Sequence, residues 1–192
     1  MADFSVTAKQ QLMAIAKASV NEGICRHRPL AVALADYEPE LSRPGASFVT
    51  LQIHQQLRGC IGSLQAHQPL ALDVADNAFS AAFRDPRFPS LQSQEVAELH
   101  FHISVLSETT AMTFADEADL LTQIRPGIDG LVLEDGIHRG TFLPSVWEQL
   151  PSKEAFLSHL KQKAGLPPRY WSPTIKVERY TVEDIDQDRL PS

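Results

Sequence analysis

The clearest pattern along the chain is an alternation of apolar and polar residues between Leu99 and Val105. Leucine, phenylalanine, isoleucine and valine occupy every second position, and histidine or serine fills the positions between them. Successive side chains of a strand point to opposite faces of its sheet, so this period of two predicts a strand with one buried face and one polar face.

Two segments show a longer period, near four residues. Apolar residues recur at this spacing over 5–20 and over 69–83, which predicts amphipathic helices. Ser5 or Thr7 is placed to cap the first helix, and Pro69 suits the first turn of the second. Further helices are expected over 116–124, 145–150 and 152–164.

Pairs of extended segments predict two hairpins. β-branched and apolar residues predominate in 47–53 and 56–62, and again in 130–134 and 140–143. A last alternating strand is expected over 175–182, whereas the prolines of 29–45 favour an irregular connection. Because strands and helices are interleaved with hairpins, the sequence predicts an α+β fold with a mainly antiparallel sheet flanked by helices.

Length and composition favour a single domain over residues 1–192. The 192 residues, 43% of them hydrophobic and 21% charged, suit one globular core. A hairpin followed by a helix occurs once near 47–83 and again near 130–164, so an internal duplication is conceivable. We find no composition shift or linker that divides the chain.

Charge and cysteine content exclude several classes of protein. The net charge of −7 weighs against a broad surface for binding nucleic acid or anionic membranes. Two cysteines are too few for a disulfide framework. No stretch of apolar residues is long enough to cross a membrane, so we expect a cytoplasmic protein. Phosphate-loop, dinucleotide and iron–sulfur motifs do not occur, and we expect no cofactor.

The segment Leu57–Leu64 (LRGCIGSL) is the candidate functional centre. Glycines within a strand mark a bulge or a close backbone approach, so Gly59 and Gly62 would expose amides beside the Cys60 thiol. An adjacent Arg58 favours a thiolate and attracts an anion, which makes Cys60 a candidate nucleophile and Arg58 a candidate anion-binding residue. The alternative is that Cys60 is a buried small side chain and the glycines serve strand curvature.

Two further groups of polar residues have open interpretations. Asp85 and Arg87 lie in a proline-stiffened turn, either as ligand-binding residues or as an internal ion pair. His100 and His102 share one strand face but lack an obvious third ligand. Glu95 or Cys60 could supply a third ligand. The spacing nevertheless matches no zinc motif, and we expect no metal. His102 and His138 are candidate bases for an enzyme that uses Cys60.

Four segments together resemble the AMMECR-one domain family, also called AmmeMemoRadiSam system protein A. They occur in the family's order and span a motif-bearing core of about residues 46–182. They are Phe48–Leu51 with Leu57–Gly62, Asp85–Phe88, Gly140–Trp147 and Lys163–Leu166.

The resemblance implies a single α+β domain with a barrel-like antiparallel sheet built from two strand and helix repeats. It also implies genomic association with a Memo-like protein and a radical S-adenosylmethionine protein, and it makes the Arg-Gly-Cys segment the hallmark. At Asp129-Gly130 many members have histidine before glycine, so that imidazole has no counterpart here. Our leading hypothesis is an accessory component that binds a small anionic ligand or a partner protein, and the alternative is a Cys60-dependent enzyme.

Overall fold

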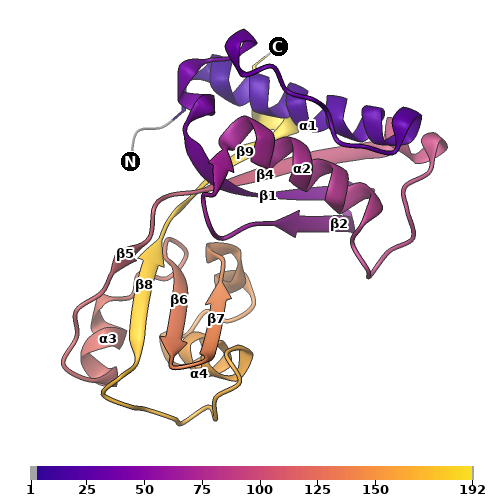
Figure 1. The fold of residues 1–192 in the computed structure, drawn as a ribbon. Helices are drawn as coiled ribbons and strands as arrows, with labels where there is room; N and C mark the ends of the chain where they lie inside the picture. The colour runs from indigo at the N-terminus through magenta and orange to yellow at the C-terminus, as the bar shows by residue number, and fades with distance from the viewer. Residues whose placement is uncertain (1–3, 192) are drawn as a thin grey trace. The chain divides into compact units, whose positions relative to one another are not determined.

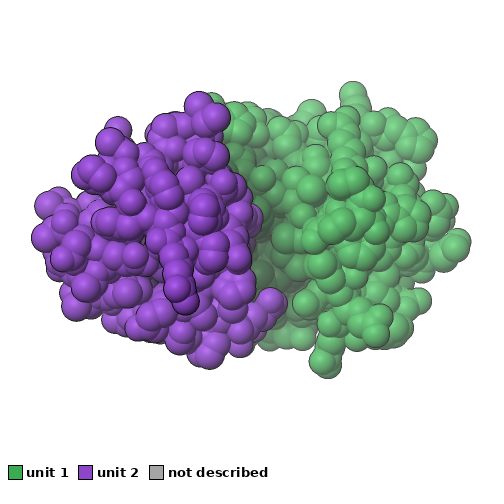
Figure 2. Space-filling model, turned by 90° about the horizontal axis from the view of Figure 1, so that it is seen from below, with its two compact units in different colours: residues 1–106, 183–192 green, residues 107–182 purple. Residues whose placement is uncertain are grey.

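The computed structural model describes residues 4–191, which form two compact units. The first unit comprises the chain up to Leu106 together with the residues from Glu183 on, and the second is Ser107–Val182. Figure 2 shows the two units in green and purple. The expectation of one domain over 1–192 stays a prediction. No described helix is both long enough and apolar enough to cross a membrane.

The first unit packs helices on one face of an antiparallel sheet (Figure 1). Its strands follow the order β2-β1-β4-β9, and β3 pairs with the start of β1. Its elements are α1 (Val6–Arg26), β1 (Pro44–Ile53), β2 (Gln56–Gly62), β3 (Gln68–Pro69), α2 (Leu70–Phe83), β4 (Leu99–Leu106) and β9 (Val182–Asp186), with 3-10 turns η1 (Leu34–Asp36), η2 (Pro39–Ser42), η3 (Ser93–Glu98) and η5 (Gln187–Arg189).

The alternation in β4 sorts its side chains between the two faces. Leu99, Phe101, Ile103 and Val105 are buried in a core shared with α1 and α2. On the opposite face, His100, His102 and Ser104 lie half-buried. Ser5 caps α1 by accepting a hydrogen bond from the Ala8 amide at 3.1 Å. Burying the apolar face of β4 against the helices therefore fixes which residues its open face presents.

The second unit has its own sheet and its own core. A four-stranded sheet of order β5-β8-β6-β7 carries a cluster in which Trp147 stacks on Phe156 at 3.8 Å between ring centroids. Its elements are β5 (Thr110–Ala111), α3 (Glu117–Gln123), β6 (Gly130–Asp135), β7 (His138–Phe142), η4 (Pro144–Glu148), α4 (Lys153–Lys163) and β8 (Lys176–Tyr180).

The predicted fold class is confirmed: helices flank mainly antiparallel sheets, and each unit contains a hairpin followed by a helix. The strands form two open sheets, neither of them closed into a barrel within the described chain. Two expected elements differ. The helix predicted over 145–150 is the 3-10 turn η4 (Pro144–Glu148). The strand predicted over 175–182 ends at Tyr180, and after Thr181 the chain enters β9, which pairs with β4 in the other sheet.

Candidate functional site

The centre of the Leu57–Leu64 segment lies on β2, an edge strand of the first sheet. The backbone of Cys60 faces away from β1, and two side chains bind it. Its amide donates to Asp85 Oδ2 at 2.9 Å, and its carbonyl accepts from Arg87 Nη2 at 3.1 Å. An unpaired strand edge invites association with other chains, and these contacts supply the partners that a further strand would have supplied. We call Asp85, Arg87 and the Cys60 backbone the edge clasp.

The two side chains of the edge clasp are also paired with each other. Arg87 Nε donates to Asp85 Oδ1 at 2.9 Å, and Arg87 Nη2 donates to Asp85 Oδ2 at 2.6 Å. The Asp85 side chain is 1% exposed and that of Arg87 is 54% exposed. The hydrogen bonds from Arg87 hold the pKa of the Asp85 carboxyl far below its usual range despite burial, and the Cys60 amide lowers it further. Asp85 is therefore an ionised structural acceptor.

Arg58 is displaced from the regular strand ladder. Gly59 pairs with Leu51 and Leu57 pairs with Gln52, which leaves Arg58 as an extra residue in a bulge. The guanidinium is bidentate to Glu95, with Nε to Oε1 at 2.8 Å and Nη2 to Oε2 at 3.1 Å. These bonds lower the pKa of Glu95. Glu95 thus serves Arg58 as a counter-ion.

The two glycines of the segment allow close packing. A Cβ at Gly59 would lie 2.0 Å from the carbonyl oxygen of Ala81 in α2, so this strand approaches the helix more closely than any side chain permits. A Cβ at Gly62 would lie 2.2 Å from the ring of Phe48, its cross-strand partner. The close backbone approach predicted from these glycines is confirmed, and it serves packing on both faces of β2.

The Cys60 thiol has a hydroxyl as its neighbour. Thr50 Oγ1 donates to Cys60 Sγ at 3.3 Å, and the sulfur is half-buried. Thr50 is aligned with both Cys60 on β2 and His102 on β4. Two strand spacings therefore separate the backbones of Cys60 and His102, about 10 Å. No imidazole in the described chain hydrogen-bonds to this sulfur.

The two candidate bases lie in different units. His102 Nε2 lies 2.9 Å from Asp184 Oδ1, and this interaction raises the pKa of the imidazole. His138 is on β7 of the second unit, where its Nδ1 lies 3.2 Å from the carbonyl oxygen of Ala164. The structure thus groups Arg58, Glu95 and the edge clasp within the first unit and leaves His102 outside that group.

The turn after α2 places an aromatic ring near two guanidiniums. Phe88 lies with its ring centroid 5.5 Å from Arg87 Cζ and 6.0 Å from Arg58 Cζ. Pro86 and Pro89 on either side are exposed, and Phe88 is half-buried. We call residues 86–89 the motif loop. The loop presents an aromatic ring, a guanidinium and two prolines, and aromatic and arginine side chains are enriched in protein interfaces. The nearby carboxylates, Asp85 and Glu95, are already bound to Arg87 and Arg58.

Sequence reasoning missed the carboxylates that face His100 and His102. Asp184 and Asp186 come from β9 and Asp188 from the turn that follows it. Their alternation with Ile185 is visible in the sequence, but the strand itself was not expected beyond Val182. The polar face of β4 is therefore covered in part by acidic side chains from the end of the chain.

The fold and this site define an α+β protein whose edge strand is closed by an Asp-Pro-Arg turn. A family model described as AMMECR1 matches residues 13–185. The chain belongs to this family, as its motifs predicted.

Individual relatives agree with this membership. The chain is 34% identical over 184 residues to a protein of Methanothermobacter thermautotrophicus, covering 92% of this chain and 93% of that protein. It is 39% identical over 155 residues to a protein of Saccharolobus islandicus, covering 77% and 68% respectively. Its fold matches the crystal structure of an uncharacterized protein from Pyrococcus horikoshii with a TM-score of 0.84 at 31% identity, covering 95% of this chain and 92% of that one.

Proposed function

We propose that this chain is an accessory component that binds a partner protein through the motif loop and does no chemistry with the Cys60 thiol. One observation carries the proposal: the charged side chains of the Leu57–Gly62 and Asp85–Phe88 motifs are held in internal ion pairs. Asp85 is bound to Arg87 and to the Cys60 backbone, and Arg58 is bound to Glu95. An enzyme that used Nε and Nη2 of Arg58 to hold a substrate would first have to break a bidentate ion pair.

The part of the motif loop that stays exposed to solvent supports a role in protein recognition. Arg87 keeps half of its side chain exposed while its inner edge is fixed by Asp85, so the guanidinium is held in one orientation. Phe88 and the two prolines of the motif loop lie beside it. Interface hot spots are enriched in arginine and aromatic residues, and a side chain that is already ordered loses less entropy on binding.

The proposed partners are those that the resemblance to AmmeMemoRadiSam system protein A implies. In the AmmeMemoRadiSam system they would be a Memo-like protein and a radical S-adenosylmethionine protein, acting with this chain in a modification pathway. We place this role in the cytoplasm, and the two free thiols, Cys25 and Cys60, support a reducing compartment. The same exposed edge of Arg87 is where a small anionic ligand would bind, the other kind of ligand named in our leading hypothesis.

Direct binding to the two proposed partners tests the function. The purified chain would be mixed with the Memo-like and the radical S-adenosylmethionine protein of the same organism, and complexes would be measured by sedimentation and calorimetry. We expect at least one complex with a dissociation constant in the micromolar range or tighter. Phe88→Ala should weaken it about tenfold or more because the ring supports both guanidiniums.

Two control variants make the binding experiment decisive. Cys60→Ser should bind as the wild type does, because the thiol takes no part in the proposed interface. Phe114→Ala removes a half-buried ring of the second unit, which packs 5.7 Å from Trp171, and should also leave binding unchanged. Failure of both partners to bind, or binding that Phe88→Ala leaves intact, would refute the proposal.

A further inference from the structure

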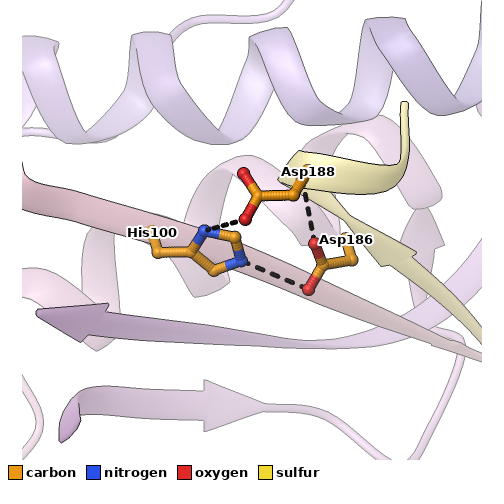
Figure 3. Close-up of side chains that lie close together, drawn as sticks. All are labelled: His100, Asp186 and Asp188. Atoms are coloured by element: carbon orange, nitrogen blue, oxygen red, sulfur yellow. Dashed lines mark hydrogen bonds and ion pairs between the residues drawn. The ribbon is translucent and has the colours of Figure 1, made fainter. Parts of the chain in front are cut away.

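The open face of β4 carries two imidazoles that meet three carboxylates from the end of the chain. Asp186 Oδ2 lies 3.2 Å from His100 Nε2 and 3.4 Å from His102 Nδ1, so one oxygen sits between the two rings. The other ring nitrogen of His100, Nδ1, lies 3.7 Å from Asp188 Oδ2. Figure 3 shows His100 with Asp186 and Asp188 turned toward its two nitrogens.

The pairing of nitrogens with carboxylates does not balance for a neutral ring. A neutral imidazole has one N–H donor and one lone pair, but each ring nitrogen of His100 faces a carboxylate oxygen. The same holds for His102 between Asp184 and Asp186. In a neutral ring one nitrogen lone pair therefore faces a carboxylate oxygen, an arrangement that either a second proton or a bound cation makes favourable.

The local charge fits a divalent ion. Asp186 and Asp188, the two carboxylates that face His100, contribute two negative charges. A divalent cation bound by both carboxylates neutralises these charges. The imidazole nitrogen that coordinates the cation adds a lone pair and no further charge.

We propose that His100, Asp186 and Asp188 form a binding site for a divalent transition-metal ion, of the class of Zn²⁺ or Mn²⁺. One ligand atom from each of the three lies within 4.8 Å of the other two. Two ligands bound at about 2.1 Å in tetrahedral geometry lie about 3.4 Å apart, so small side-chain rotations bring the three atoms into place. Water completes the coordination, because the Asp188 side chain is 78% exposed.

The donor set selects the kind of ion. One imidazole and two carboxylates suit zinc, manganese, iron and cobalt, whereas an all-oxygen set would favour magnesium or calcium. Asp186 is held in place because its Oδ1 accepts the Asp188 amide at 2.9 Å, which fixes the turn that carries both carboxylates. His102 lies beside Asp186 and orients it from the other side, as outer-sphere residues of metal sites do. The site is independent of the motif loop and of the proposed partners.

Metal titration of tag-free protein tests the site. After removal of metals with a chelator, Zn²⁺ and Mn²⁺ would be added separately and followed by calorimetry, with bound metal counted by elemental analysis. We expect one equivalent of at least one ion to bind in the micromolar range or tighter. Replacing the ion by Co²⁺ should give a visible absorption band characteristic of low coordination number.

Variants locate the bound ion. His100→Ala and Asp188→Asn should each weaken binding about tenfold or more. Asp188→Asn is the milder change, because its side chain is exposed and the backbone turn stays intact, so it tests the site even if His100→Ala unfolds the protein. His54→Ala is the matched control, since His54 lies in the turn between β1 and β2 and pairs with Glu98 at 2.9 Å, without a third metal-ligating group among the described residues. No stoichiometric binding, or binding that Asp188→Asn leaves unchanged, would overturn the inference.

Discussion

Replacing Gly59 with alanine is expected to destabilise the protein by about 3 kcal/mol, at the upper end of the cost of overpacking. The added Cβ would lie 2.0 Å from the Ala81 carbonyl oxygen and 2.9 Å from its carbon, and both are backbone atoms of α2. No side-chain rotation relieves that overlap. Strand β2 and helix α2 must separate, which opens the core between them.

Equilibrium unfolding in urea measures this cost. Cys60→Ala is the matched control, because it changes the next residue of the same strand on the opposite face, where the side chain is half-buried. We expect that variant to lose about 1 kcal/mol or less. Stability of Gly59→Ala within about 0.5 kcal/mol of the wild type would mean that this glycine is not required by packing.

Asp85→Asn should cost about 2–3 kcal/mol, the range for hydrogen bonds to a charged buried group. The amide can accept from Cys60, but its NH₂ group would face the Arg87 donors, so the edge clasp opens. The same change at Asp76 is the matched control, because Asp76 lies exposed on α2 with only a 3.1 Å hydrogen bond from Gln68. Equal stability of the two variants would refute the structural role of Asp85.

The same carboxylate predicts a pH dependence. The folded pKa of Asp85 lies below the unfolded value of about 4. A lowered pKa means that the stabilisation is complete above about pH 4 and is lost as the pH falls toward the folded value. Between about pH 5 and pH 2 the wild type should therefore lose more stability than Asp85→Asn, and parallel losses would contradict this assignment.

Local patterns predicted the elements of this fold well. The alternation in β4, the helical spacing in α2 and the break at His54-Gln55 each depend on residues close in sequence, and the structure contains all three. The split of the last predicted strand could not be seen in the same way. Nothing local distinguishes 175–180 from 182–186, because their separation arises from pairing with strands of different sheets.

The sequence predicted which residues form the candidate site, but it did not predict the hydrogen bonds and ion pairs among them. The sequence left two interpretations of Asp85 and Arg87 open, and the structure has them as an ion pair. It gave no sign that Arg58 would bind Glu95, 37 residues away, or that Asp85 would bind the Cys60 amide, 25 residues away. The expectation of no metal depended on the lack of a third ligand, and β9 brings Asp186 to His100 across 86 residues.

The rate at which Cys60 is alkylated tests the central claim most directly. Single-cysteine variants, Cys25→Ser and Cys60→Ser, would be treated with iodoacetamide between pH 6 and pH 9 while folded. Because Cys60 is half-buried beside Thr50 and Cys25 is exposed, we predict slower labelling of Cys60 at every pH. Faster labelling of Cys60 than of Cys25 near pH 6 would reveal an activated thiolate. That result would contradict the claim that the Cys60 thiol does no chemistry, and it would favour a cysteine-dependent enzyme.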